Sequence, residues 1–200
     1  MSGTAPFSEP FARFDELLQR AKAIAPAILP EPTAFALGTV SDDGQPAVRI
    51  ILLKGADELG FVFYTNFESR KGRELLAHPK AAMCFHWQSL VRQVRVEGVT
   101  SPVSTEEADA YFASRERGSQ IGAWASEQSR TIARAGDLEA RIRDAEARFE
   151  GKPVTRPPYW SGFRLVPSRI EFWRGMPSRL HERDMYTREG DGWRKEVRYP

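Results

Sequence analysis

Five short apolar segments joined by brief polar turns or a short helix dominate the first half of the chain. Their patterns predict strands at residues 34–40, 46–53, 60–65, 80–87 and 91–99. Because these connections leave little room for the crossover helices that parallel strands need, we expect an antiparallel sheet. Such a sheet hides its edges by closing into a barrel whose openings are covered by helices. The expected fold class is therefore mainly β with flanking helices.

Helical patterns lie before, within and after this run of strands. Ser8 is a plausible N-cap for a helix of about residues 9–25. Ser69 and Ser104 are plausible caps for two shorter helices, and residues 137–149 form a charged amphipathic pattern. These helices are expected to cover the ends of the sheet.

Strands are expected again in a C-terminal β region of about residues 160–200, which includes a hairpin around residues 189–192. No internal repeat or convincing linker divides the sequence, and 200 residues are close to the length of an ordinary domain. We therefore expect residues 1–200 to form a single domain.

Charge and cysteine content argue against several classes of function. The 29 basic and 27 acidic side chains give a net charge of +2, which does not favour nucleic-acid binding. No apolar stretch is long enough to span a membrane. One cysteine and three scattered histidines argue against a zinc site. The lone cysteine also suits a reducing compartment, so we expect a cytoplasmic location.

The segment from Tyr64 to Arg73 is the first candidate site. A strand ends there, and a helix begins with Arg70 and Lys71 in its first turn. Basic side chains at a helix N-terminus oppose the helix dipole unless an anion is bound. The segment therefore indicates a phosphate site, with a solvated basic helix start as the alternative.

Polar side chains also interrupt or end the apolar strands. Arg49 lies inside the apolar segment 48–53, so it must be paired, reach an edge or bind a ligand. Lys54 follows that segment, and strict alternation would place it on the face opposite Arg49. Gln93, on a later strand, could contact a ligand, although the Arg–Glu pair beside it suits a solvated face.

Tyr111, Arg115 and Ser119 form another group. Tyr111 and Arg115 are four residues apart and would share one helix face, with Ser119 in a glycine-containing turn. A phenol, a guanidinium and a hydroxyl that converge could bind a monophosphate. An exposed helix end without a ligand is the alternative.

Arg179, His181 and Arg183 alternate, so on a strand they would share one face. The flanking arginines disfavour the charged imidazole, which leaves a neutral ring that can donate or accept a hydrogen bond. A surface strand without a ligand is the alternative.

In order and spacing, these segments resemble the pyridoxamine 5′-phosphate oxidase family of FMN enzymes. The resemblance extends from about residue 32 to the end, and its motifs are RIILLK, FYTNFESRKG, RQVRVEG, YFASRERGSQIGAWAS and EFWRGMPSRLHER. Each motif alone is weak, but five in register are specific. The resemblance implies an antiparallel split β-barrel that forms a homodimer with two FMN sites at the subunit interface.

The resemblance also assigns cofactor residues. The flavin site would be lined by Arg49, Ile50, Ile51, Leu52, Leu53 and Lys54. The flavin and its phosphate would be bound by Tyr64, Thr65, Arg70, Lys71 and Gln93. Further contacts would come from the other subunit through Gln128, Ser129, Trp173 and Arg183.

Substrate residues are implied in the same way. The substrate phosphate would be held by Lys54, Tyr111, Arg115 and Ser119, while Arg179 and His181 would be catalytic and lie over the pyridine ring. Many family members have a longer N-terminal segment that can fold over the substrate. Here about ten residues precede the first expected helix, which leaves lid closure open.

The implied reaction is oxidation of pyridoxamine 5′-phosphate, or pyridoxine 5′-phosphate, to pyridoxal 5′-phosphate, with oxygen as acceptor and hydrogen peroxide as product. Two alternatives stay open. One is a flavin oxidase of the same fold with another substrate, as in phenazine biosynthesis. The other is a split-barrel module that binds flavin or haem without turnover.

Overall fold

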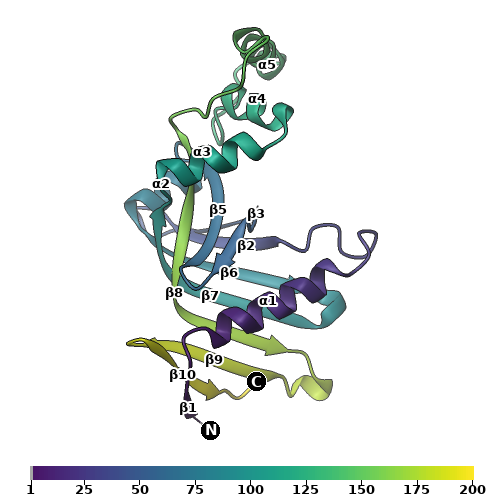
Figure 1. The fold of residues 1–200 in the computed structure, drawn as a ribbon, viewed down its shortest axis with the longest axis vertical. Coiled ribbons are helices and arrows are strands. Elements are labelled where there is room, and N and C mark those ends of the chain that lie inside the picture. The colour runs from purple at the N-terminus through teal and green to yellow at the C-terminus, as the bar shows by residue number, and fades with distance from the viewer. Residues whose placement is uncertain (1) are drawn as a thin grey trace.

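Within residues 2–200, which the computed structural model describes, one antiparallel sheet of ten strands is accompanied by five α-helices (Figure 1). The strands are β1 (Ser2–Ala5), β2 (Ala34–Val40), β3 (Pro46–Leu52), β4 (Gly55–Asp57), β5 (Gly60–Asn66), β6 (Lys80–Trp87), β7 (Arg92–Pro102), β8 (Trp160–Arg174), β9 (Glu182–Glu189) and β10 (Gly192–Val197). The helices are α1 (Glu9–Lys22), α2 (Arg70–Ala77), α3 (Thr105–Ser114), α4 (Arg117–Ala125) and α5 (Asp137–Arg148). The mainly β fold class expected from the sequence is confirmed.

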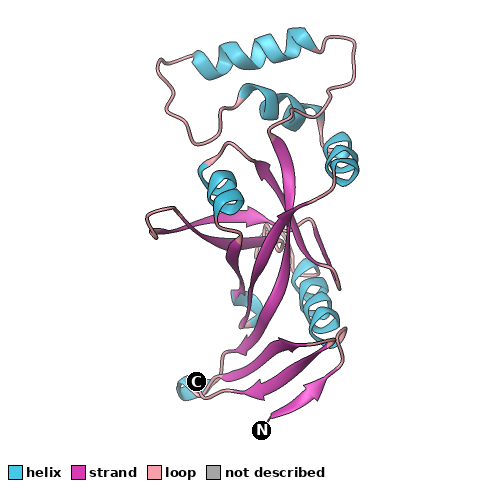
Figure 2. Ribbon diagram, turned by 90° about the vertical axis from the view of Figure 1, so that its left-hand side faces the viewer, coloured by secondary structure: helices cyan, strands magenta, loops and turns pink. Residues whose placement is uncertain are grey.

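Strand β8 connects the two ends of the molecule. Its 15 residues pair with β7 along most of their length, with β5 at the start and with β9 at the end. The remaining strands extend the sheet in the order β1-β10-β9-β8-β7-β6-β2-β3, and β4 pairs with β5. As a result, helices α3, α4 and α5 gather at one end and strands β1, β9 and β10 at the other (Figures 1 and 2).

The main core lies between helix α1 and the sheet. The ring of Phe14 is 1% exposed and lies 4.9 Å from the ring of Phe61 and 5.0 Å from that of Phe85, measured between centroids. Ion pairs join the same helix to the far strands, since Arg13 contacts Asp184 at 2.7 Å. A second, smaller core joins α3, α4 and α5 to the start of β8.

Several expected elements agree closely with the structure. The predicted strand at residues 80–87 coincides with β6, and the side chains of Ser69 and Ser104 cap α2 and α3. In contrast, Ser8 makes no side-chain capping bond, and α1 ends at Lys22. The sequence analysis did not anticipate β1, β4 or α4.

The expected strand through Arg179, His181 and Arg183 is wrong. Residues Pro177–Arg179 form a short 3-10 turn, and β9 begins only at Glu182. The cause is the backbone of Ser178 and Arg179, whose φ angles of 56° and 61° lie in the left-handed region. Extended alternation therefore cannot place these three side chains on one face.

Membrane insertion through a helix is not indicated, because no helix within residues 2–200 is both long and apolar enough to span a bilayer.

We expect Phe14→Ala to lower the free energy of unfolding by about 3–5 kcal/mol, since it leaves a cavity among buried rings. Urea denaturation measures this change. The control is Glu16→Ala on the exposed side of the same helix, which should change stability by less than about 0.5 kcal/mol. Equal effects for the two variants would contradict the docking of α1 through Phe14.

Candidate active site

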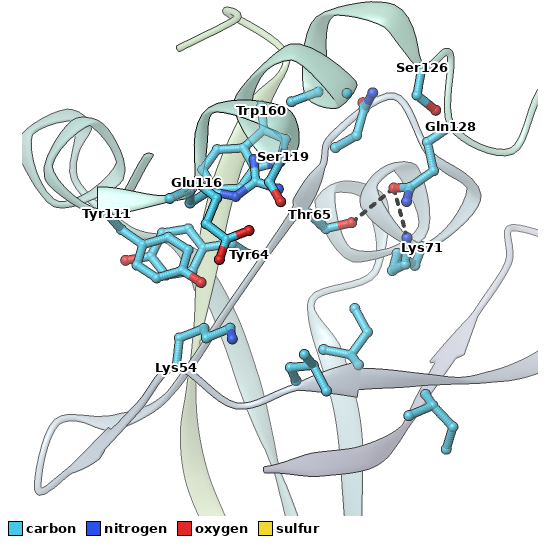
Figure 3. Close-up of a pocket in the computed structure, with 17 residues that line it drawn as sticks. Lys54, Tyr64, Thr65, Lys71, Tyr111, Glu116, Ser119, Ser126, Gln128 and Trp160 are labelled. Atoms are coloured by element: carbon cyan, nitrogen blue, oxygen red, sulfur yellow. Dashed lines mark hydrogen bonds between the residues drawn. The ribbon is translucent and has the colours of Figure 1, made fainter. Parts of the chain in front are cut away.

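A cavity of about 700 Å³ opens between strands β3 and β5 on one side and helices α3 and α4 on the other (Figure 3). A second cavity, of about 600 Å³, adjoins it, because Ile50, Lys71 and Gln128 line both. Eleven of the expected site residues line the larger cavity: Ile50, Ile51, Leu52, Lys54, Tyr64, Thr65, Lys71, Tyr111, Arg115, Ser119 and Gln128. Three more line the smaller one: Arg49, Arg70 and Ser129.

Lys71 lies at the junction of the two cavities. Its side chain is largely buried, and its Nζ donates hydrogen bonds to Ser69 Oγ at 3.2 Å and to Gln128 Oε1 at 3.1 Å. Burial, together with the nearby charge of Arg49, lowers the pKa of Lys71 to about 8. A bound anion would offset both effects, so the surroundings of Lys71 suit a phosphate group.

The turn before α2 holds this lysine in place. Ser69 Oγ accepts a hydrogen bond from Gly72 N and caps the helix. A Cβ atom at Gly72 would lie 2.4 Å from the carbonyl oxygen of Asn66, so only glycine allows the first helical turn to approach the preceding loop this closely. Of the basic helix start predicted from the sequence, Lys71 is therefore buried against its own turn, whereas the side chain of Arg70 is about half exposed.

Glu74 organises the neighbouring arginines. Arg49 contacts its Oε2 at 3.2 Å and Arg70 its Oε1 at 2.8 Å, while Thr39 donates to it at 2.5 Å. Burial opposes ionisation of this carboxyl, but the hydrogen bonds from Thr39 and Arg70 and the charge of Arg49 lower its pKa. The buried carboxylate thus holds two guanidinium groups beside Lys71.

Aromatic rings form the opposite wall of the larger cavity. Tyr64 and Tyr111 stack with their centroids 3.9 Å apart, and Trp160 lies 5.4 Å from Tyr64 in a nearly parallel plane. Gly162 makes room for this stack, because a Cβ atom there would lie 2.8 Å from the Tyr64 ring. Burial and the neighbouring Glu107 raise the pKa of Tyr64 to about 12, so its hydroxyl stays protonated at neutral pH.

Lys54, Arg115 and Ser119 also line this cavity. Figure 3 labels Lys54 and Ser119 beside the aromatic rings. Lys54 follows the end of β3, and its backbone N–H donates to the carbonyl of Val62. Arg115 is not on the helix face expected for it, because α3 ends at Ser114 and Arg115 has an extended backbone. Ser119 lies within helix α4 rather than in the expected turn. The three side chains nevertheless reach one cavity.

The remaining expected residues lie at the other end of β8. Gln93, Trp173 and Arg183 are directly opposite one another on β7, β8 and β9, so they form a row across one face of the sheet. Arg183 contacts the buried carboxylate of Glu171 at 2.7 Å. The ring of His181 lies 4.7 Å from that of Trp173.

A backbone hydrogen bond orients the ring of His181. The N–H of Met176 donates to its Nδ1 at 3.2 Å, so in the neutral ring Nε2 carries the proton and is the available donor. Arg179, two residues before it, owes its orientation to the left-handed backbone of the same loop. His181 and Arg179 therefore belong to a compact loop beside the row of Gln93, Trp173 and Arg183.

Two tryptophans of these groups lie at opposite ends of one strand. Trp160 lines the larger cavity, and Trp173 lies thirteen residues further along β8. An extended strand of that length covers about 40 Å. Within one chain, Trp173 and Trp160 are therefore too far apart to contact the same small ligand.

Gln128 and Leu53 have further contacts within this chain. Gln128 contacts Lys71 and Thr65 of the same chain, and its expected approach to the flavin of the other subunit stays a prediction. Leu53 is buried in the main core and does not line either cavity. The sequence analysis also missed Trp160 and Glu116, which line the larger cavity but carry no motif signal of their own.

Comparisons with known proteins agree with this arrangement. Residues 21–149 match the family model described as pyridoxamine 5′-phosphate oxidase, and residues 160–200 match a pyridoxine 5′-phosphate oxidase C-terminal dimerisation region. The pyridoxine/pyridoxamine 5′-phosphate oxidase of Myxococcus xanthus strain DK1622 is 57% identical over 192 residues, which is 96% of this chain and 92% of that one. The enzyme of the same name from Zymomonas mobilis is 53% identical and covers 96% and 98% of the two chains.

The chain belongs to the pyridoxine/pyridoxamine 5′-phosphate oxidase family. The predicted enzyme class, oxidation of a phosphorylated B6 vitamer, is therefore confirmed, and so is FMN, the cofactor of this family. Of the alternatives, the phenazine type is more distant. PhzG from Burkholderia lata 383, in complex with tetrahydrophenazine-1-carboxylic acid, has a TM-score of 0.88 but 31% identity, covering 96% of this chain and 92% of that one.

The expected split-barrel fold is confirmed by the same structural match and by a second one. An FMN-binding protein of Nostoc punctiforme, related to pyridoxamine 5′-phosphate oxidase, has a TM-score of 0.75 at 19% identity and covers 99% of this chain and 100% of that one. The region that matches the dimerisation model contains β8, β9 and β10. It includes Trp173 and Arg183, which lie opposite Gln93 in the row across the sheet. This match supports the expected homodimer of the oxidase.

We expect the affinity of this oxidase for FMN to fall as the pH rises from about 7 to 9. Lys71 is charged below its pKa of about 8 and loses its proton above it, which removes one partner of the phosphate. Fluorescence titration of FMN should show a loss of up to roughly tenfold, because the protonated fraction of a group with a pKa of about 8 falls about tenfold between pH 7 and pH 9.

Lys71→Met should bind FMN weakly and with little pH dependence between these two values. Arg70→Ala is the control, because it leaves Lys71 in place and should keep the wild-type change of FMN affinity with pH. A wild-type affinity that is constant over this interval would show that Lys71 does not contact the phosphate.

Proposed function

We propose that each active site of this oxidase is built from two copies of the chain, with FMN held between them. The observation that carries the proposal is that Trp160, beside the cavity, and Trp173, in the region that matches the dimerisation model, lie at opposite ends of β8. The cavity group, which includes Lys71 and Arg115, lies at one end of this strand and the Trp173 row at the other. A two-fold dimer is the commonest closed assembly and would bring opposite ends of two chains together at two equivalent sites.

The cofactor phosphate is assigned to the junction of the two cavities. Lys71 supplies a buried ammonium group there, and the guanidinium groups of Arg49 and Arg70 are held beside it by Glu74. Gln128 and Ser129 reach the same junction from the loop after α4. That loop is attached to the turn before α2 by an ion pair of 3.2 Å between Arg130 and Glu68.

The substrate phosphate is assigned to the aromatic end of the larger cavity. Lys54 reaches it from the end of β3, and Tyr111, Arg115 and Ser119 reach it from one segment that joins α3 to α4. Figure 3 labels Lys54, Tyr111 and Ser119. Binding at the phosphate is remote from the carbon that reacts, so it can fix the position of the pyridine ring without taking part in the chemistry.

The overall reaction converts pyridoxamine 5′-phosphate, water and oxygen into pyridoxal 5′-phosphate, ammonia and hydrogen peroxide. With pyridoxine 5′-phosphate no water is consumed and no ammonia is released. When bound, FMN would accept a hydride, and with it two electrons, from the substrate carbon and would pass the two electrons to oxygen. The protein supplies binding, orientation and exclusion of water.

His181 and Arg179 are assigned to the substrate. With Met176 N–H donating to Nδ1, the Nε2–H of His181 is free to donate to a polar group of the substrate. A guanidinium group is a poor general base, so the role assigned to Arg179 is to orient the ring and cover the reacting carbon. The cytoplasmic location expected from the lone cysteine stays a prediction.

Hybrid dimers test whether a site contains two chains. Lys71→Met and Trp173→Leu should each abolish most activity, because each removes one half of every site. In a dimer of one chain of each kind, one site carries both defects and the other carries none, so purified hybrids should recover about half of the wild-type activity. Differently tagged chains and a steady-state oxygen-consumption assay provide the measurement. Hybrids as inactive as their parents would show that each site lies within one chain.

Arg179→Ala and His181→Ala should retain FMN and the dimer but lose catalytic efficiency. We expect kcat/KM for pyridoxamine 5′-phosphate to fall roughly ten- to thousandfold, or about 1.4–4 kcal/mol of transition-state stabilisation. Leu180→Ala is the control, since that exposed side chain lies between them in sequence and has no assigned role. Loss of FMN with normal turnover per bound flavin would move the residue concerned to the cofactor site.

A further inference from the structure

Arg115 differs from the other arginines assigned to the active site. Arg49 and Arg70 contact Glu74, and Arg183 contacts Glu171. No carboxylate within residues 2–200 forms an ion pair with Arg115, and its buried Nη1 atom has no hydrogen-bond partner there. Burial lowers the pKa of this guanidinium, which shows that its charge is poorly compensated in the free protein.

An aromatic face takes the place that a carboxylate has beside the other arginines. The guanidinium carbon of Arg115 lies 4.7 Å from the ring centroid of Trp160 and 5.6 Å from that of Phe112. The face of an indole carries partial negative charge and attracts a cation without accepting its proton. This contact stabilises the guanidinium but leaves its net charge intact.

The same indole supports the two tyrosines of the cavity. Its ring plane lies within 8° of that of Tyr64 and within 10° of that of Tyr111, at centroid distances of 5.4 Å and 6.1 Å. Trp160 therefore contacts both sides of the subsite assigned to the substrate phosphate, the phenol side and the guanidinium side (Figure 3).

Trp160 is itself rigidly held. Its side chain is 7% exposed, and the ring of Phe112 packs edge-on against it at 5.1 Å. Its carbonyl oxygen accepts a hydrogen bond of 2.7 Å from Arg156, which is anchored to Asp109 at 2.6 Å. A fixed ring of this kind can define the position of a longer and more flexible arginine.

We propose that Trp160 is a positioning residue that holds Arg115 ready for the phosphate of the substrate. This inference rests on the proposed substrate subsite, and it explains why that subsite would prefer a phosphorylated substrate to one without the phosphate. A carboxylate in the same place would neutralise the guanidinium and compete with the incoming phosphate for its N–H groups. The indole does neither, so the full charge of Arg115 is available to a phosphate dianion.

The test compares one substrate that has the phosphate with one that lacks it. Steady-state kinetics of the FMN-loaded enzyme are measured with pyridoxamine 5′-phosphate and with pyridoxamine, for the wild type, Trp160→Leu and Trp160→Phe. Trp160→Leu should raise KM for the phosphorylated substrate roughly 5- to 30-fold with little change in kcat, the range expected for a cation–π contact that excludes water. Its kcat/KM for pyridoxamine should fall much less, so that the preference for the phosphorylated substrate drops at least about fivefold.

Trp124→Leu is the matched control. This tryptophan belongs to the same small core and has the guanidinium of Arg148 at 4.1 Å from its ring, but it does not line the cavity. It should lose stability, as Trp160→Leu does, without a selective effect on the phosphorylated substrate. Should Trp160→Leu fail to fold, Trp160→Phe decides, because it keeps an aromatic face and should raise the same KM by about two- to fivefold.

Three results would count against these assignments, and they are distinguishable. If the wild type prefers pyridoxamine 5′-phosphate and the Trp160 variants lose efficiency equally with both substrates, Trp160 is only structural and the inference fails. The inference also fails if Trp124→Leu raises KM for the phosphorylated substrate to the same extent. A wild-type enzyme that does not discriminate between the two substrates would instead overturn the proposed phosphate subsite.

Discussion

The pairing of β8 with three other strands is the constraint on which the rest of the structure depends. Its first residues are hydrogen-bonded to β5 and its last to β9, while β7 follows it for most of its length. The strand therefore carries Trp160 into the cavity near the helices and Trp173 into the row near the C-terminal strands. In the proposed two-chain site, the length that makes β8 a stable scaffold would also separate the two halves of the site. The fold and the proposed role of a partner chain would then have one physical origin.

Charge is distributed unevenly among the site cations. The carboxylate of Glu74 compensates the charges of Arg49 and Arg70. Lys71 contacts only a hydroxyl and a side-chain amide, and Arg115 contacts aromatic faces. In both cases burial lowers the pKa of the cation. A protein selected for stability alone would pair or replace such groups, because uncompensated buried charge is unfavourable. Their retention is explained by ligands that bring the missing negative charge.

The parts of the fold that were predicted correctly depend on local patterns. Residues 80–87 alternate between buried and exposed positions as β6 does, and Ser69 and Ser104 cap helices through side-chain bonds to residues three positions later. Local chemistry suffices for such elements. The loop at Ser178 and Arg179 was missed because two successive non-glycine residues adopt a left-handed backbone, which no propensity favours.

The site shows the same division between local and distant information. Arg70 and Lys71 could be recognised because they follow a capping serine in a basic helix start. The contact of Gln128 with Lys71 joins segments 57 residues apart, and Trp160 reaches Arg115 across 45 positions of sequence. Contacts of this range depend on how the sheet and the helices pack, so motif spacing could not predict the contact between Gln128 and Lys71 and gave Trp160 no role.

The left-handed loop at Ser178 and Arg179 has a consequence for how this protein can change. Each non-glycine residue in that conformation costs of order 1–3 kcal/mol of folding free energy, and two lie side by side beside His181. The side chain of Ser178 makes no hydrogen bond within the described residues, so glycine at this position would remove part of the cost while leaving the backbone path available. At Arg179 the same relief would delete the guanidinium. A glycine substitution that raises stability is therefore compatible with the proposed site at Ser178 but not at Arg179.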